Sequence, residues 1–270
     1  MLMKRVCMVI FAFNILMLGC RFGKGSDDQY SSDLVPTEEF TVDSIVKEED
    51  EPKTPKDAYD ALLKSLSLLR ESLEYKPEGF DVSRFDGIFS KVWNASSQED
   101  KCGVLVGLKR NIEALGNLET IIGNLMVGID LQKNGVNDVN YIAAVDLLSV
   151  ICHDGLIVNH IVNGIAFSKI NLSKLKDSQD VSGLNEVRKN LDSMRVQREA
   201  LAMLYKDIIG KAAILSDKGS IKEALIPIID NTVGNFSMIT KCDTKQICAA
   251  RSELKKMSNH IQYKVHQLIQ

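Results

Sequence analysis

The sequence predicts an all-α protein, an elongated bundle of six or seven helices that follows a signal peptide and a disordered tether. From Pro55 onward, apolar residues recur at steps of three and four, the spacing of one face of an α-helix. This region has no strand-like alternation of apolar and polar residues, and no Asn-Gly pair between apolar runs. The first 56 residues lack the helical pattern and divide into an apolar and an acidic segment.

Residues 1–19 have the pattern of a secretory signal peptide. Lys4 and Arg5 precede an apolar run that ends at Leu18, which is the order of regions in such signals. The run is shorter than the roughly 20 residues needed to cross a membrane. Its end, Leu18-Gly19-Cys20, resembles a lipobox, where bacteria attach lipid to the cysteine and cleave before it. We expect lipid on Cys20; the alternative is an ordinary signal peptide cut nearby.

Residues 20–56 are expected to be the lipidated cysteine and a disordered acidic tether. From residue 21 to residue 56 there are ten acidic and five basic residues and few large apolar ones. Such a composition buries too little apolar surface to offset the entropy of ordering. The remainder, residues 57–270, is the expected helical domain.

The order of the expected helices follows from breaks in the apolar pattern. Thr54 and Pro55 suit an N-cap and the first helical position, and Lys133-Asn134-Gly135 suits a helix end. A kink is expected at Pro227. Glycines such as Gly103, Gly107, Gly116, Gly123 and Gly128 are scattered within helices; we expect the last three either to let helices approach closely or to soften the helix. The expected later helices cover Arg84–Asn94, Ser96–Ile129, Val139–Ile170, Leu184–Leu215, Ile221–Ile239 and Thr244–Ile269.

Four cysteines lie in the expected helical domain. An even number outside the cytoplasm is typical of disulfides, and Cys242 and Cys248 are close enough in sequence to pair locally. Cys102 would then pair with Cys152. Free buried thiols are the alternative, because cysteine packs well as a small apolar residue.

Two charged residues interrupt apolar seams. Arg198 lies in the seam of its helix, and Asp154 lies in the seam of the preceding long helix. A buried charge needs a partner, so the two are expected to form a buried ion pair. One alternative is that the Arg198 side chain extends to the edge of the bundle and keeps its charge in water. The functional alternative is a polar pocket in which Arg198 binds a ligand carboxylate.

No catalytic, metal or cofactor constellation is found in the sequence. His153 and His160 are seven residues apart, whereas two histidines that share a zinc on a helix are usually four apart. His153 and the neighbouring Cys152 point in different directions on a helix. His260 and His266 are expected to be solvated. We therefore predict a protein that is not an enzyme and that has no cofactor or metal.

Charge argues against nucleic acid as a partner. Without the signal and the tether, the helical domain has no net formal charge, whereas nucleic-acid-binding domains are usually basic. The most cationic surface expected is on the last helix. It is interpreted either as a solvated helix face or as a site for a polyanion such as a glycosaminoglycan, and it consists of Lys241, Lys245, Arg251, Lys255, Lys256 and Lys264.

The lipobox, the acidic tether and the helical body rich in Lys, Asn, Ile and Leu together resemble surface lipoproteins of Borrelia-type spirochaetes. The resemblance implies an outer-membrane, cell-surface location and binding of host factors. It identifies no binding residue, because Leu18-Gly19-Cys20 is its only motif. A periplasmic structural or assembly lipoprotein is the second hypothesis, and an enzyme or small-ligand carrier using Asp154 and Arg198 is the third.

Overall fold

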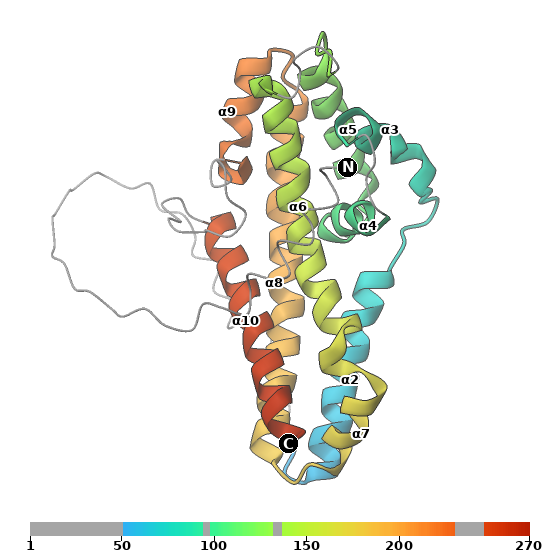
Figure 1. Cartoon of the computed structure of the whole chain (residues 1–270), viewed down its shortest axis with the longest axis vertical. Coiled ribbons are helices and arrows are strands. Elements are labelled where there is room, and N and C mark those ends of the chain that lie inside the picture. Colours follow the sequence, from blue (N-terminus) through green and yellow to red (C-terminus); the bar gives the residue numbers. More distant parts are fainter. Residues whose placement is uncertain (1–50, 94–97, 132–136, 230–245) are drawn as a thin grey trace, which may run out of the picture. The chain divides into compact units, whose positions relative to one another are not determined.

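Every regular element in the described part of the chain is a helix. The computed structural model describes residues 51–93, 98–131, 137–229 and 246–270. Within these ranges lie nine α-helices and two short 3-10 helices (Figure 1). The all-α prediction is confirmed, although the helices outnumber the six or seven expected. They are α2 (Pro55–Glu74), η2 (Val82–Phe85), α3 (Asp86–Val92), α4 (Gln98–Gly107), α5 (Ile112–Met126), α6 (Val139–Asn163), η4 (Ile165–Phe167), α7 (Lys169–Asp177), α8 (Val181–Ala213), α9 (Lys218–Ile229) and α10 (Gln246–Leu268).

The start of α2 agrees with the sequence. Pro55 occupies the first turn, and the Thr54 hydroxyl accepts a hydrogen bond from the Asp57 backbone N–H at 3.2 Å. This bond satisfies one of the N–H groups that a helix start leaves without an intrahelical acceptor.

The folded body begins earlier than the expected boundary at residue 56. The Asn185 side-chain amide donates to the Pro52 carbonyl oxygen at 2.9 Å, and Lys189 Nζ lies 2.8 Å from Glu51 Oε1. Glu51 and Pro52 are therefore held against the first turns of α8 rather than belonging to the tether.

The expected helix over residues 96–129 is divided into α4 and α5. Lys109 and Arg110 both adopt φ of 52°, the left-handed region that ends a helix. Asn111 then begins α5 by accepting a hydrogen bond from the Ala114 N–H at 2.9 Å. The apolar spacing continues across the turn because both helices contribute to the same core.

A second division separates α6 from η4 and α7. Gly164 follows the last residue of α6, and a Cβ at this position would lie 2.0 Å from the His160 carbonyl oxygen. No side chain larger than hydrogen fits in this conformation, so glycine at position 164 permits the backbone to leave the helix there. The expected helix over 139–170 therefore ends at Asn163.

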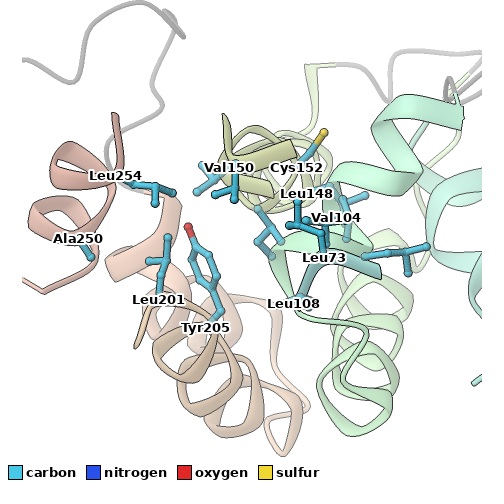
Figure 2. Packing of buried hydrophobic residues seen from close by; sticks show 14 of the residues in the cluster. Leu73, Val104, Leu108, Leu148, Val150, Cys152, Leu201, Tyr205, Ala250 and Leu254 are labelled. Carbon is cyan, nitrogen blue, oxygen red and sulfur yellow. The ribbon is translucent and has the colours of Figure 1, made fainter. Parts of the chain in front are cut away.

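The long helix α8 lies at the centre of the bundle, with α2, α5, α9 and α10 packed around it, and α6 packs on α4, α9 and α10. Aliphatic residues from these helices form one core, part of which Figure 2 shows around Tyr205. Within the described residues, Val139–Phe167 is the one segment long and apolar enough to cross a membrane. In its most apolar stretch, 56% of the segment is buried inside the bundle. The segment therefore serves as a core helix.

Candidate functional site

A buried charged cluster joins three helices. Asp154 comes from α6, Tyr205 from α8 and Arg251 from α10, and all three are buried. Arg251 Nε lies 2.7 Å from Asp154 Oδ2 and 3.0 Å from Oδ1, and the Tyr205 hydroxyl donates to Oδ2. In Figure 2 the Tyr205 hydroxyl points away from α8, between Val150 of α6 and Leu254 of α10.

The electrostatics of this cluster favour a neutral Tyr205 and a charged Arg251. Burial and the nearby Asp154 carboxylate raise the pKa of Tyr205 well above its ordinary value, so its hydroxyl stays a neutral donor. Burial, the largest single influence, would lower the pKa of Arg251, but Asp154 and Tyr205 together outweigh burial and raise it. His153 Nδ1, on the half-exposed neighbouring residue, lies 3.4 Å from Asp154 Oδ1. The arrangement suits a structural connection between helices, not a nucleophile or a proton shuttle.

The expected ion pair between Asp154 and Arg198 is wrong. Arg198 is 3% exposed and donates to the Ser72 hydroxyl at 3.2 Å and to the Val106 carbonyl oxygen at 3.0 Å. Burial without a hydrogen-bonded carboxylate lowers its pKa to about 10. Among the described residues its Nε has no hydrogen-bond partner. Arg198 is directed at helix carbonyl groups rather than at a pocket for a ligand carboxylate.

Arg110, which the sequence did not single out, completes this arrangement. Its guanidinium donates to the carbonyl oxygens of Leu73 and Tyr75 at the end of α2. The acceptor of Arg198 in α4, Val106, also lies in the last turn of its helix. Cations at helix C-termini satisfy free carbonyls and oppose the helix dipole. Arg110 and Arg198 therefore cap the ends of α2 and α4.

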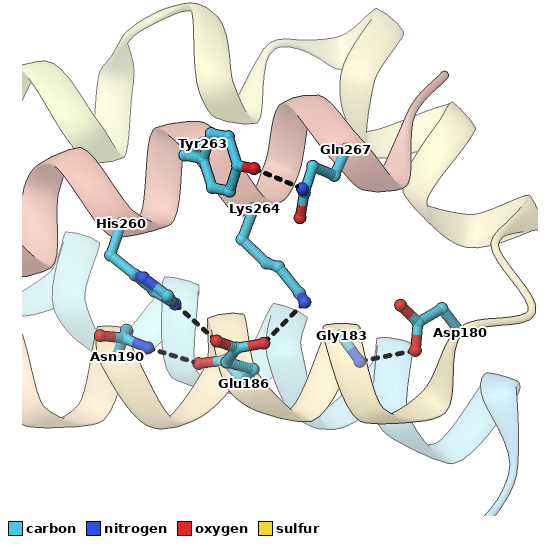
Figure 3. A network of polar contacts seen from close by, with 8 residues as sticks. All are labelled: Asp180, Gly183, Glu186, Asn190, His260, Tyr263, Lys264 and Gln267. Carbon is cyan, nitrogen blue, oxygen red and sulfur yellow. Dashed lines mark hydrogen bonds and ion pairs between the residues drawn. The ribbon is translucent and has the colours of Figure 1, made fainter. Parts of the chain in front are cut away.

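A more exposed polar network links α8 to α10 (Figure 3). Glu186 lies between His260 and Lys264, with His260 Nε2 2.7 Å from its Oε1 and Lys264 Nζ 2.8 Å from its Oε2. The hydrogen bond from Lys264, and next that from His260, lower the pKa of Glu186. His260 is thus a cross-helix contact rather than simply solvated. His160 makes a similar contact between α6 and α4, 2.8 Å from Glu99 Oε1.

The expected cationic face of the last helix does not hold as a whole. Arg251 is buried against Asp154, contrary to the prediction. Lys256 Nζ lies 2.6 Å from Glu253 Oε1, and Lys264 is bound to Glu186. Lys255 is half-buried, and Lys241 and Lys245 lie outside the described residues. What is described of this face therefore has too few free cations to favour a polyanion.

The cysteines fall into two classes. Cys102 and Cys152 are free thiols, the second of the two alternatives, whereas Cys248 is disulfide-bonded. Cys20 and Cys242 lie outside the described residues. No group of three or more His, Cys, Asp or Glu that could hold a metal ion is found in the part of the chain that the structure describes.

Four exposed apolar side chains lie on three segments, the end of α5, the start of α6 and the end of α8. Lys218 connects these segments, because its Nζ donates to the Val127 carbonyl oxygen at 2.6 Å and it interacts electrostatically with Asp138, the N-cap of α6. We call the apolar side chains exposed around this contact the distal surface; they are Val127, Val139, Ile142 and Ile214.

The distal surface and the contact of residues 51–52 lie at opposite ends of α8. Glu51 and Pro52 bind its first turns, and Ile214 is its C-cap. A helix of 33 residues spans about 50 Å at 1.5 Å per residue. Figure 1 shows α2 and α8 beginning together at the end of the bundle that holds the C-terminus. We call this the proximal end.

Comparisons with protein-family models, with curated proteins and with solved structures find no match for this chain.

Proposed function

We propose that this chain is a lipid-anchored interaction protein without catalytic activity. Cys20 bears the lipid, the protein is held at the outer membrane and cell surface, and the helical bundle binds a protein of the host. The observation that carries the proposal is that the two ends of the bundle differ. The chain that leads from Cys20 joins the proximal end, and the distal surface is about 50 Å away along α8.

The side chains of the distal surface suit binding to another protein. Exposed apolar side chains that cluster are typical of interaction sites, whereas single ones are common on any surface. Ile214 is 85% exposed, and Val127 and Val139 are also exposed around Lys218. Because the Lys218 ammonium already has an acceptor, the surface offers a partner mainly apolar contacts.

The ionisable groups of the core support a role other than catalysis. Asp154, Tyr205 and Arg251 bind one another, and Arg198 binds Ser72 and a helix carbonyl. An enzyme or small-ligand carrier would need these groups to be free to bind a substrate or ligand. The hypothesis of an enzyme or carrier therefore ranks last of the three. The resemblance of the whole chain, in its architecture, to spirochaetal surface lipoproteins favours a host partner.

The anchor is tested by expressing the full chain and its Cys20→Ala variant in a bacterium fed a radiolabelled fatty acid. Label on the parent protein alone, with release of the variant from membranes, is expected; label on the variant would contradict the anchor. Added protease then separates cell-surface from periplasmic placement. Cleavage on intact cells supports the cell surface, and cleavage only after permeabilisation supports the alternative of a periplasmic assembly protein.

Binding is tested with a matched pair of variants. Ile214 of the distal surface and Ile165, which follows the opposite end of α6, are 85% and 86% exposed, so Ile214→Asp and Ile165→Asp change two equally exposed side chains. The full chain is first used to capture binding proteins from serum and matrix extract. Each captured protein should then bind the Ile214→Asp variant at least tenfold more weakly than the parent chain, and should bind Ile165→Asp as tightly as the parent. Equal affinity for both variants would exclude the distal surface.

A further inference from the structure

Helices α4 and α6 approach each other closely at the two free cysteines. Gly103 of α4 directly follows Cys102, and a Cβ at Gly103 would lie 2.7 Å from Cys152 Sγ and 2.8 Å from the Cys152 carbonyl oxygen. Cys102 itself packs against the same core as Cys152. The lack of a side chain at Gly103 thus brings the backbone beside Cys102 into contact with Cys152.

The two thiols differ in their surroundings. Cys102 is half-buried, whereas Cys152 is buried. Burial, followed by the charges of Asp100 and Glu99, raises the pKa of Cys152 to about 12 from an ordinary 9.0. The thiolate is the reactive form, so Cys152 is ionised far less often than an ordinary cysteine. Cys102 is also close enough to affect Cys152 electrostatically.

The same chain forms a disulfide at Cys248. Disulfides persist in oxidising compartments outside the cytoplasm, so Cys102 and Cys152 meet oxidants wherever the Cys248 bond is stable. Neither thiol belongs to the distal surface.

We propose that Cys102 and Cys152 are an oxidisable pair that closes to a disulfide between α4 and α6 by exchange with a small-molecule disulfide. The Cys102 thiolate attacks one sulfur of that molecule, forms a mixed disulfide and releases one thiolate. The Cys152 thiol then loses its proton, and its sulfur attacks Cys102 Sγ and releases the second thiolate. Two protein thiols are oxidised and one small disulfide is reduced to two thiols.

The order of the two steps follows from the surroundings of the thiols. Cys102 reacts first because it is the more accessible thiol and Cys152 is rarely ionised. In the second step both sulfurs belong to one molecule, and Cys102 directly precedes Gly103, whose backbone contacts Cys152. An intramolecular reaction has a high effective concentration, which compensates for the low thiolate fraction of Cys152. The product joins two helices that already touch at Gly103.

The test treats the full chain in detergent with oxidised glutathione, then quenches with acid, blocks remaining thiols after unfolding, and digests with trypsin without reduction. Trypsin places each thiol in a peptide with no other cysteine, Cys102 in Cys102–Lys109 and Cys152 in Asn134–Lys169. Mass spectrometry should find a glutathione adduct on Cys102 first, and then the two peptides linked, with the link lost on reduction.

Two variants separate the steps. Cys152→Ser should stop at the glutathione adduct on Cys102, and Cys102→Ser should leave Cys152 unmodified in the folded protein. If a variant fails to fold, the order in which the adduct and the linked peptides appear in the wild-type chain still tests the proposal. A lasting adduct on Cys102 without linked peptides, a first adduct on Cys152, or linkage only after unfolding would each overturn the proposal.

Discussion

Gly155 of α6 lies so close to Gly103 of α4 that a Cβ on Gly155 would stand 2.0 Å from the Gly103 carbonyl oxygen. The two helices therefore meet backbone to backbone. A Cβ on Gly155 would also lie 2.7 Å from the Gly107 nitrogen. Because backbone atoms cannot move aside as the end of a flexible side chain can, this contact requires glycine.

Gly155→Ala should destabilise the protein by about 3 kcal/mol or more, because the methyl group forces α4 and α6 apart. Urea unfolding measures the change. Gly116→Ala is the matched control, since Gly116 is also within a helix and nothing lies within 4 Å of a Cβ there. The control should gain about 0.5–1 kcal/mol from reduced backbone entropy. Equal losses in both variants would contradict the close contact.

Arg251→Met should destabilise the bundle by about 3–5 kcal/mol, because Asp154 then remains buried without its cation. Adding Asp154→Asn should restore much of this loss, since the amide removes the unpaired charge and its oxygen still accepts from Tyr205. Urea unfolding of the two single variants and the double variant gives the coupling energy. Additive losses would show that Asp154 and Arg251 do not interact.

Arg198→Met should change stability by only about 1 kcal/mol or less, although Arg198 is as deeply buried as Asp154. Both groups that accept from Arg198 keep another hydrogen bond, because the Ser72 hydroxyl donates to the Leu69 carbonyl and the Val106 carbonyl accepts from the Lys109 N–H. The variant also avoids the cost of burying a charge without a carboxylate partner. A loss as large as that of Arg251→Met would contradict this interpretation.

The contact between α8 and α10 should weaken in acid. The pKa of Glu186 is below its ordinary 4.5 in the folded protein, chiefly through the hydrogen bond from Lys264. The stability that Glu186 contributes is therefore present above about pH 4.5 and is lost as the pH falls through the lower folded value. Urea unfolding of wild type and Glu186→Gln should differ at pH 6, and the difference should shrink toward pH 3. A constant difference would exclude ionisation of Glu186 as its cause.

Local features were predictable from the sequence because their physics is local. Thr54 and Pro55 mark the start of α2 through a hydrogen bond that spans three residues. The class of the fold followed in the same way from the spacing of apolar residues. The break at Lys109 and Arg110 was missed because neither residue is one that usually adopts a positive φ.

Partners distant in sequence were not predictable in the same way. Arg251 lies 97 residues from Asp154, and apolar spacing does not specify which helices become neighbours. A signal was present, since Arg251 stands four residues after Ile247 and three before Leu254, in the apolar seam of α10.

The glycines show the same limit. A Cβ on Gly116 or Gly128 would meet nothing within 4 Å, and one on Gly123 only the Lys91 ammonium at 3.7 Å, so these three do not bring helices together. The close contacts use Gly103, Gly107 and Gly155 instead. The sequence shows the same residue type at all six positions. Only the packing of α4 on α6 separates the glycines at the helix contact from the others.

The contact of Glu51 and Pro52 with α8 has a mechanical consequence. A pull on the chain from its N-terminal side reaches the folded body at Lys189 and Asn185 before it reaches α2. Since α2 and α8 begin at the same end and pack along each other, a force directed away from the distal surface slides α2 lengthwise against α8. Such shear stresses the buried leucines of α2 all at once, whereas peeling would separate them one at a time. The bundle should therefore resist tension at the end where the chain enters.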